Sequence, residues 1–373
     1  MSIPFIDLKT QYNRLAPQIN TAIQEVLDDG QYILGGALNK FETEAAEYSG
    51  VNFCAGVSSG TDALLIPLMC RNIGRGDAVF VPSFTYTASA EVILLIGATP
   101  VFVDVDPDDF NLDIDHLEAK IAEVNGSGKL RPAAIIAVDL FGLPADYSRL
   151  NQLAVKEDLL LIADAAQSYG GALDGKRVGN LAPVTATSFF PAKPLGCYGD
   201  GGGIFTDSAE LDNLIRSIRT HGQGEHKYDV VRIGLNARLD TLQAAILSVK
   251  LGILKEEIEK REQLACYYDE NLGDLVRVQK RLANQQSAWA QYTFRAENRD
   301  QLQKHLQESG IPAVIYYPKP MHFQQAYEAY GKGRGSLPVS EQLCSEVISL
   351  PMHPYMDEET AAGIVECVRK FYL

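Results

Sequence analysis

Short apolar runs alternate with amphipathic stretches between residues 51 and 206. Several of these runs are almost continuously apolar, which is typical of strands covered on both faces. The stretches between them space their apolar residues by three and four, as helices do. This alternation predicts an α/β fold around a mostly parallel sheet. The predicted strands lie at 53–59, 77–83, 98–105, 132–140, 159–166, 186–190 and 201–206, and the predicted helices at 61–73, 88–98 and 147–158.

The pattern changes after residue 206. Residues 240–272 read as one long amphipathic helix, long enough to connect two domains. A strand-like run at 290–297, a helix at 299–310, a loop-like stretch at 316–327 and a final helix after Pro354 follow. We therefore expect a large domain of residues 1–250, which begins with a helical segment, and a smaller C-terminal α+β domain of residues 251–373.

The composition is that of a globular protein, with 46% hydrophobic and 22% charged residues in 373. The first residues lack a basic segment followed by an apolar core, and no run of about twenty apolar residues exists, so we expect a soluble, cytoplasmic protein. With 33 basic and 48 acidic residues, the net charge of −15 repels nucleic acids and anionic membranes. A ligand that carries phosphate therefore needs a locally built site.

Several features suggest metal or nucleotide sites but do not match them. The six cysteines are scattered without a C-x-x-C pair, which favours reduced thiols over a zinc site or disulfides. The acidic run at 104–115 lacks the glycine and the closing glutamate of a calcium loop, so we expect a turn with a helix cap. His221 and His226 stand five residues apart, whereas two metal ligands on one helix face stand four apart, so metal binding is not expected. Residues 199–203 lack the G-x-G-x-x-G spacing of a dinucleotide site.

Two small signals follow strand ends in the α/β part. Gly60 and Thr61 follow an apolar run and open a helical pattern, where backbone N–H groups bind anions. A plain helix N-cap explains them as well. Asp164 ends another run, at the sheet edge where ligands bind, and a carboxylate there pairs with a cationic ligand nitrogen or caps a helix. Gln167, three residues later, faces the same ligand or solvent.

The segment SFFPAKPLGCYGDGG, at 188–202, places Ser188 and Lys193 among apolar and turn-forming residues. Burial disfavours the lysine cation and lowers its pKa, which favours a neutral amine nucleophile. Snorkelling to the surface is the alternative, although Pro191, Pro194 and the glycines offer no helix on which such a charge would sit. Tyr86, just past a strand end, stacks on a flat ligand or fills core.

Together these residues supply an anion cradle, a carboxylate, a stacking face and a reactive amine. Pyridoxal 5′-phosphate requires all four, because a lysine holds its aldehyde as a Schiff base and an acidic partner keeps its ring nitrogen protonated. The sequence therefore predicts a pyridoxal phosphate enzyme.

An ordered series of motifs spans nearly the whole chain: FIDLKTQY, GQYILGG, SSGTDAL, DAAQS, SFFPAKPLGCYGDGG, GLNARLDTLQAA, YYPKPMH and SLPMHP. In these motifs the sequence resembles the DegT/DnrJ/EryC1/StrS family of sugar aminotransferases. This resemblance implies a pyridoxal-phosphate-dependent transferase of fold type I, the aspartate aminotransferase type. Within the family the chain most resembles enzymes that aminate the 3-keto group of a UDP-linked N-acetylated hexuronic acid for O-antigen sugars.

The resemblance also implies roles for single residues. Lys193 would hold the cofactor and then move the proton between the substrate carbon and C4′. Asp164 would pair with the ring nitrogen, with Tyr86 stacked on the ring and Gln167 beside it. The residues implied to hold the phosphate are Gly60, Thr61, Ser188 and, from the neighbouring subunit, Asn236. A homodimer with shared active sites follows from this.

The substrate residues implied by the resemblance come from the second half of the chain. Tyr316 and Tyr317 match positions that contact the nucleotide across the subunit interface, although relatives often carry His where Tyr316 stands. His322 lies in KPMH, where PLH is commoner. Arg238, two residues after Asn236, is our candidate for the C6 carboxylate of a uronate, because a guanidinium matches a carboxylate with two hydrogen bonds. A structural salt bridge to Asp240 is the alternative.

The expected reaction moves an amino group from L-glutamate, which becomes 2-oxoglutarate, to a UDP-linked keto sugar. The expected acceptor is UDP-2-acetamido-2-deoxy-3-oxo-glucuronate, and the 3-amino product serves O-antigen or lipopolysaccharide biosynthesis. A neutral dTDP- or UDP-linked keto-deoxysugar is the alternative acceptor. A sugar dehydratase would replace Lys193 by histidine, and a non-catalytic regulator would carry a DNA-binding segment or basic patch that the sequence lacks.

Overall fold

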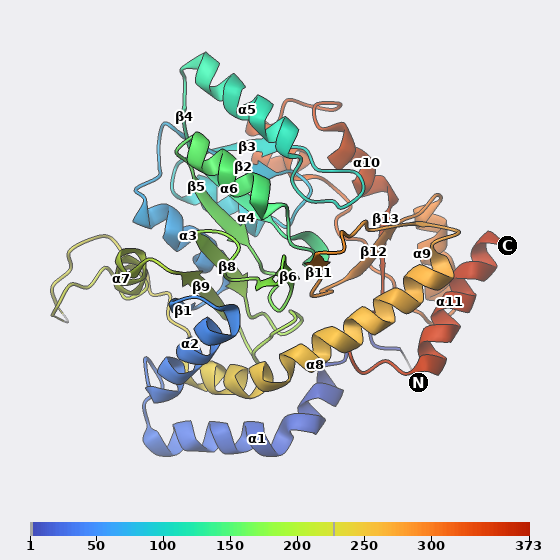
Figure 1. The fold of residues 1–373 in the computed structure, drawn as a ribbon, viewed down its shortest axis with the longest axis horizontal. Coiled ribbons are helices and arrows are strands. Elements are labelled where there is room, and N and C mark those ends of the chain that lie inside the picture. The colour runs from blue at the N-terminus through green and yellow to red at the C-terminus, as the bar shows by residue number, and fades with distance from the viewer. Residues whose placement is uncertain (1–2, 227) are drawn as a thin grey trace.

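A seven-stranded sheet lies at the centre of the larger part of the molecule (Figure 1). The computed structural model describes residues 3–226 and 228–373. The strand order is β1-β9-β8-β5-β4-β2-β3, and only β9 runs against the other six, antiparallel to both of its neighbours. The predicted α/β fold with a mostly parallel sheet is therefore confirmed. The strands are β1 (Phe53–Val57), β2 (Asp77–Pro82), β3 (Thr99–Val103), β4 (Arg131–Val138), β5 (Leu160–Asp164), β8 (Val184–Ser188) and β9 (Gly202–Thr206).

Helices cover both faces of this sheet. Successive strand residues point to opposite faces, and the neighbours Ile135 and Ile136 of β4 enter two different hydrophobic cores. Because both faces are buried, the strands are apolar at almost every position, as their sequence pattern predicts. One core packs against α3 (Gly60–Cys70), α4 (Ala88–Leu95) and α7 (Ala209–Ile218), and the other against α5 (Ile114–Ser127) and α6 (Tyr147–Lys156).

The acidic run at 104–115 forms a turn and then caps α5. The Asp113 carboxylate accepts a hydrogen bond of 3.0 Å from the backbone N–H of His116, three residues into the helix. This is the usual arrangement of an aspartate N-cap. The predicted turn with a helix cap is therefore confirmed.

The predicted long helix is α8 (Thr241–Leu272), which crosses the molecule from the side of α1 and α2 to the C-terminal part (Figure 1). Its first half packs against α1 (Leu8–Asp29) and α2 (Gly36–Ser49). Its second half enters another core through Ala265, Tyr268 and Leu272. The expected boundary between 1–250 and 251–373 falls inside α8 and stays a prediction.

The C-terminal part combines an antiparallel sheet with helices. Its strands are β10 (Arg277–Val278), β12 (Tyr292–Arg295) and β13 (Val347–Leu350), and its helices are α9 (Arg299–Glu308), α10 (Pro338–Glu346) and α11 (Glu358–Tyr372). A small sheet joins β6 (Ala172–Leu173), β7 (Lys176–Arg177) and β11 (Gln285–Gln286), and the 3-10 turns are η1 (Leu140–Gly142), η2 (Met321–Phe323) and η3 (Gln325–Tyr330). Within the described ranges, no helix combines the length and apolar character that crossing a membrane requires.

Candidate active site

The carboxyl ends of β1, β8 and β5 bring Gly60, Ser188 and Asp164 to one edge of the sheet. Strand β9 pairs with β1 and β8 so that Gly202 stands opposite both Val57 and Ser188. The start of α3 packs directly on this junction, because a Cβ atom on Gly60 would lie 2.6 Å from the Ser188 Cβ. Only glycine allows the helix start to approach the strand so closely.

The start of α3 presents free hydrogen-bond donors. Among the described residues, none accepts a hydrogen bond from the backbone N–H of Gly60 or Thr61. The next two N–H groups are satisfied by Ser59, whose Oγ accepts from Asp62 at 3.0 Å and whose carbonyl accepts from Ala63 at 3.0 Å. Unpaired N–H groups at a helix start attract a phosphate. The hydroxyl of Ser188 stands beside them and fits the same ligand.

Lys193 lies in the bend between β8 and β9. Its backbone N–H donates to the Phe190 carbonyl at 2.9 Å, while its amine forms no ion pair with any described carboxylate. Burial lowers the pKa of the Lys193 amine, and the negative charge of Asp164 opposes that shift. A half-buried lysine whose amine forms no salt bridge suits a nucleophile.

Asp164 is 5% exposed at the end of β5. Its carboxylate accepts 2.7 Å from the Ser89 hydroxyl and 3.2 Å from the backbone N–H of Ala166. Burial raises the pKa of Asp164, while these two hydrogen bonds and Lys193 lower it. A buried carboxylate of this kind is stabilised by a cationic ligand nitrogen. Ser89, which comes from α4, carries no local signal in the sequence.

Gln167 is buried and not solvated. Its side-chain oxygen accepts 2.8 Å from the backbone N–H of Phe141, and its amide nitrogen donates to the Tyr317 hydroxyl at 3.4 Å. It therefore ties η1, the turn after β4, to a tyrosine more than a hundred residues away in sequence. No local pattern predicts such a contact.

Tyr86 and Tyr317 form an aromatic wall beside these groups. Tyr86 is 58% exposed and so does not fill core, and its ring centroid lies 6.3 Å from that of Tyr317. Burial and the nearby Asp164 raise the pKa of Tyr317. Both rings line an open pocket, which Thr87, Lys319, Gln324 and Tyr327 complete.

Tyr316 packs on this wall, with its ring centroid 5.8 Å from that of Tyr317, whereas His322 lies apart from it. The ring of Tyr316 is half-buried and packs 6.3 Å from Phe5. His322 is 2% exposed, with its Nδ1 2.6 Å from the Ser83 hydroxyl and its Nε2 3.3 Å from the Glu341 carboxylate. Burial lowers the pKa of His322. The structure thus places His322 in the interior, tied to β2 and α10, and its substrate contact stays a prediction.

Asn236 and Arg238 lie on the segment between α7 and α8, part of which projects from the body of the molecule (Figure 1). Asn236 is exposed. The Nε of Arg238 is buried without a hydrogen-bond partner, and no ion pair joins Arg238 to Asp240. The salt-bridge alternative is therefore not formed within the described chain.

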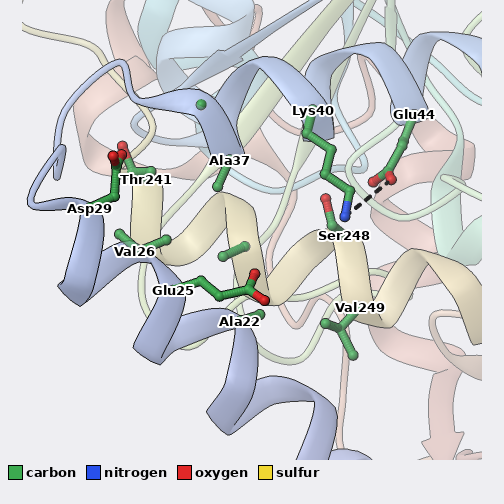
Figure 2. A pocket seen from close by; sticks show the side chains of 12 residues that line it. Ala22, Glu25, Val26, Asp29, Ala37, Lys40, Glu44, Thr241, Ser248 and Val249 are labelled. Atoms are coloured by element: carbon green, nitrogen blue, oxygen red, sulfur yellow. Dashed lines mark ion pairs between the residues drawn. The ribbon is translucent and has the colours of Figure 1, made fainter.

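A second hollow lies between α1, α2 and the start of α8 (Figure 2). Glu25 and Asp29 face it from α1, and Lys40 and Glu44 from α2 form an ion pair of 3.9 Å across its wall. None of the predicted site residues lines it. It is therefore separate from the cluster around Lys193.

Comparison with known proteins identifies the family of the chain. The model of the DegT/DnrJ/EryC1/StrS aminotransferase family matches residues 13–369. The UDP-2-acetamido-2-deoxy-3-oxo-D-glucuronate aminotransferase of Pseudomonas aeruginosa is 46% identical, over 95% of this chain and 96% of its own length. A pleiotropic regulatory protein of Geobacillus stearothermophilus is 41% identical, over 100% of this chain and 99% of its own.

The fold agrees with this. A DegT/DnrJ/EryC1/StrS aminotransferase of Brucella abortus has a TM-score of 0.97 and 53% identity, covering 99% of each chain. The sugar aminotransferase Spr1654 of Streptococcus pneumoniae, solved in its PMP and PLP forms, has TM-scores of 0.90 and 0.89 at 26% and 25% identity, covering 99% of this chain. The residues here fit that cofactor, because the α3 donors suit a phosphate and the buried Asp164 suits a ring nitrogen. The chain belongs to the DegT/DnrJ/EryC1/StrS aminotransferase family and is a pyridoxal-phosphate-dependent enzyme of fold type I, as the sequence predicted.

Proposed function

We propose that this aminotransferase moves an amino group from L-glutamate to the 3-keto group of a UDP-linked 2-acetamido-2-deoxy-3-oxo-hexuronate. The assignment of a uronate as the acceptor rests on Arg238, whose guanidinium has a buried nitrogen without a hydrogen-bond partner. A uronate supplies a carboxylate that a neutral sugar lacks, and arginine binds carboxylates through paired hydrogen bonds. The 46% identical relative from P. aeruginosa is named for a substrate of this class.

The chain's own residues fit the chemistry of transamination. When bound, the cofactor supplies an electron sink for the carbon that loses its proton. Lys193 would serve as the group that takes and returns this proton, because burial lowers the pKa of its amine and no ion pair engages it. Asp164 would hold the proton on the ring nitrogen, and the N–H groups of Gly60 and Thr61 with the Ser188 hydroxyl would hold the phosphate.

The aromatic wall serves the proposed binding roles. Tyr86 is proposed to stack on the cofactor ring, and Gln167, which bonds Phe141 and Tyr317, is proposed to lie beside that ring. Tyr316 and Tyr317 are proposed to contact the nucleotide. His322, whose ring nitrogens face Ser83 and Glu341, is proposed to support the segment that carries it, and its own contact with the substrate stays a prediction.

A homodimer with shared sites belongs to the same proposal. The segment that carries Asn236 and Arg238 exposes Val230, Val231 and Ile233 by 62%, 51% and 83%. Apolar side chains gathered on a projecting segment favour contact with another protein surface. A second copy of this chain is the partner that would also give Asn236 and Arg238 a site to reach.

Substrate assays test the acceptor. Purified enzyme is incubated with L-glutamate and, in parallel, with the 3-oxo uronate and with neutral UDP- and dTDP-linked keto sugars, and the products are identified by mass spectrometry and NMR. Amination of the uronate with formation of 2-oxoglutarate is the expected result. Preferential amination of a neutral keto sugar would instead establish the alternative acceptor. The cytoplasmic location and the use of the product in O-antigen or lipopolysaccharide remain predictions.

A further inference from the structure

The bend that carries Lys193 is a tight fold of the backbone between β8 and β9. The Cys197 N–H donates to the Phe189 carbonyl at 2.8 Å, and the Lys193 N–H donates to Phe190 at 2.9 Å. A side chain on Gly196 would clash with the carbonyl oxygens of Phe190 and Pro191. The bend is thus closed on itself, and Lys193 stands at its middle.

Helix α8 holds this bend from behind at two points. The Gln243 side-chain oxygen accepts 2.8 Å from the Tyr198 N–H, and its amide nitrogen donates 3.4 Å to the Tyr198 carbonyl. The Lys250 amine donates to the Gly196 carbonyl. Residues seven apart lie on one face of a helix and about 10.5 Å apart along it. The two side chains therefore hydrogen-bond to neighbouring parts of the same bend, at Tyr198 and Gly196.

Lys250 is an unusual residue for a helix interior. It is 2% exposed, and within the described chain no carboxylate lies at ion-pair distance from its amine. The amine stands 4.8 Å from the centroid of the Tyr198 ring, which provides a cation–π contact. Burying an ammonium group without an ion pair is costly, and a methionine would fill similar space without that cost. Packing alone therefore does not explain an amine here.

The charged groups around Lys250 do not explain a buried amine either. Burial lowers the pKa of Lys250 to about 8, opposed by Glu257 and Cys197 and reinforced by Arg261. Glu257 is itself occupied by Gln11, which donates to it at 2.9 Å and 3.0 Å. The contacts that remain to the Lys250 amine are the Gly196 carbonyl and the Tyr198 ring.

We propose that Lys250, assisted by Gln243, is a positioning residue that fixes the 189–199 bend and so sets the position of Lys193. The proposal rests on the proposed role of Lys193 as the lysine that bonds the cofactor. It assigns to α8 a function beyond joining two cores: its inner face is the support of the reactive lysine.

Hydrogen–deuterium exchange of the cofactor-free, full-length protein tests the support directly. In Lys250→Met we expect the amides of Lys193 and Cys197 to exchange about ten- to a hundredfold faster, because a charge-assisted hydrogen bond to the bend is lost. The matched control is Lys255→Met on the same helix, because the Lys255 side chain is 73% exposed and its amine reaches only Glu259, at 3.9 Å. That variant should exchange like the wild type.

A second variant keeps the test decisive where Lys250→Met folds poorly. Gln243→Ala removes the other grip without disturbing a buried charge, and it should accelerate exchange at Tyr198 and Cys197 in the same experiment. Unchanged exchange in the bend of either folded variant, or acceleration spread evenly over α8 and the sheet, overturns the proposal, since even acceleration reports only general loss of stability.

Measurements on the holoenzyme separate positioning from mere stability. For Lys250→Met we expect about tenfold weaker cofactor retention and a lower kcat, with KM for the keto sugar little changed, and for Lys250→Arg partial recovery of both. If Lys250→Met instead raises KM for the keto sugar and leaves kcat unchanged, the positioning role is contradicted. The exchange data do not depend on what Lys193 does, so failure of the support and failure of the proposed role of Lys193 are distinguishable.

Discussion

Lys193 is the residue on which the proposed chemistry depends. We expect Lys193→Ala to lose turnover and the visible absorbance of the lysine-bound cofactor, because no other amine approaches Asp164 in the described chain as Lys193 does. The far-UV circular dichroism and the thermal transition should remain close to wild type, since the side chain forms no structural ion pair. Lys255→Ala, on the exposed face of α8, serves as the control. Multiple turnover by Lys193→Ala at the wild-type rate would contradict the assignment of Lys193 as the lysine that bonds the cofactor.

Arg238 decides between a uronate and a neutral sugar. We expect Arg238→Ala to lower kcat/KM for the keto sugar about ten- to a hundredfold, since a charge-assisted contact is lost. Arg238→Lys should recover only part of this, because an ammonium group lacks the planar pair of donors. Glutamate also carries carboxylates, so the half-reactions must be measured separately by stopped-flow absorbance. If the glutamate half-reaction becomes slower and transfer to the keto sugar stays unchanged, the assignment of a uronate as the acceptor is contradicted.

At the level of the elements, the start of α3 depends on a single glycine. We expect Gly60→Ala to weaken cofactor binding about tenfold or more, because its Cβ would lie 2.6 Å from Ser188 and push the helix start off β8, a strain of about 1–3 kcal/mol. Gly36→Ala is the matched control, since Gly36 also opens a helix and has no atom within 4 Å of an added Cβ. Equilibrium dialysis with pyridoxal phosphate measures the effect, and equal affinities of the two variants would rule out the close approach as its cause.

Helix α8 makes a prediction about pH. The pKa of Lys250 falls from its usual 10.5 to about 8 in the folded chain, so between these values the unfolded chain binds more protons. The free energy of unfolding therefore rises with pH in this window through Lys250, as the cost of a buried charge is relieved. Thermal unfolding of apoenzyme from pH 7.5 to 10, values chosen to bracket about 8, should show wild type gaining stability relative to Lys250→Met. A constant difference across this range would mean that Lys250 does not titrate there.

The sequence predicts elements better than it predicts contacts between them. The apolar runs identify the strands because both faces of the sheet are buried, and strand ends place Asp164 and Ser188 at one edge. Ser89, which bonds Asp164, and Lys250, which supports the bend, carry no local signal, since their partners lie 75 and 54 residues away. His322 illustrates the converse case: a motif identifies the residue, while only the fold shows that Ser83 and Glu341 enclose it.

At the scale of the whole molecule, two of the proposed site residues have side-chain groups that bond nothing within the described part of one chain. Asn236 is exposed, and the buried Nε of Arg238 has no partner among the described residues. Both lie on the segment that exposes Val230, Val231 and Ile233. A second copy that receives this segment would bury the apolar side chains and bring Asn236 to the phosphate held by the α3 donors of its neighbour.

Mixed dimers test this arrangement. Asn236→Ala alone should lower cofactor retention, because one donor to the phosphate is removed, and Lys193→Ala alone should be inactive. If each site combines Lys193 of one chain with Asn236 of the other, a mixed dimer contains one site with both lesions and one with neither. Mixing the two variants should then restore activity beyond that of either parent, measured after subunit exchange has been verified by native mass spectrometry. Activity that equals the average of the two parents after complete exchange would show that each site is built within one chain.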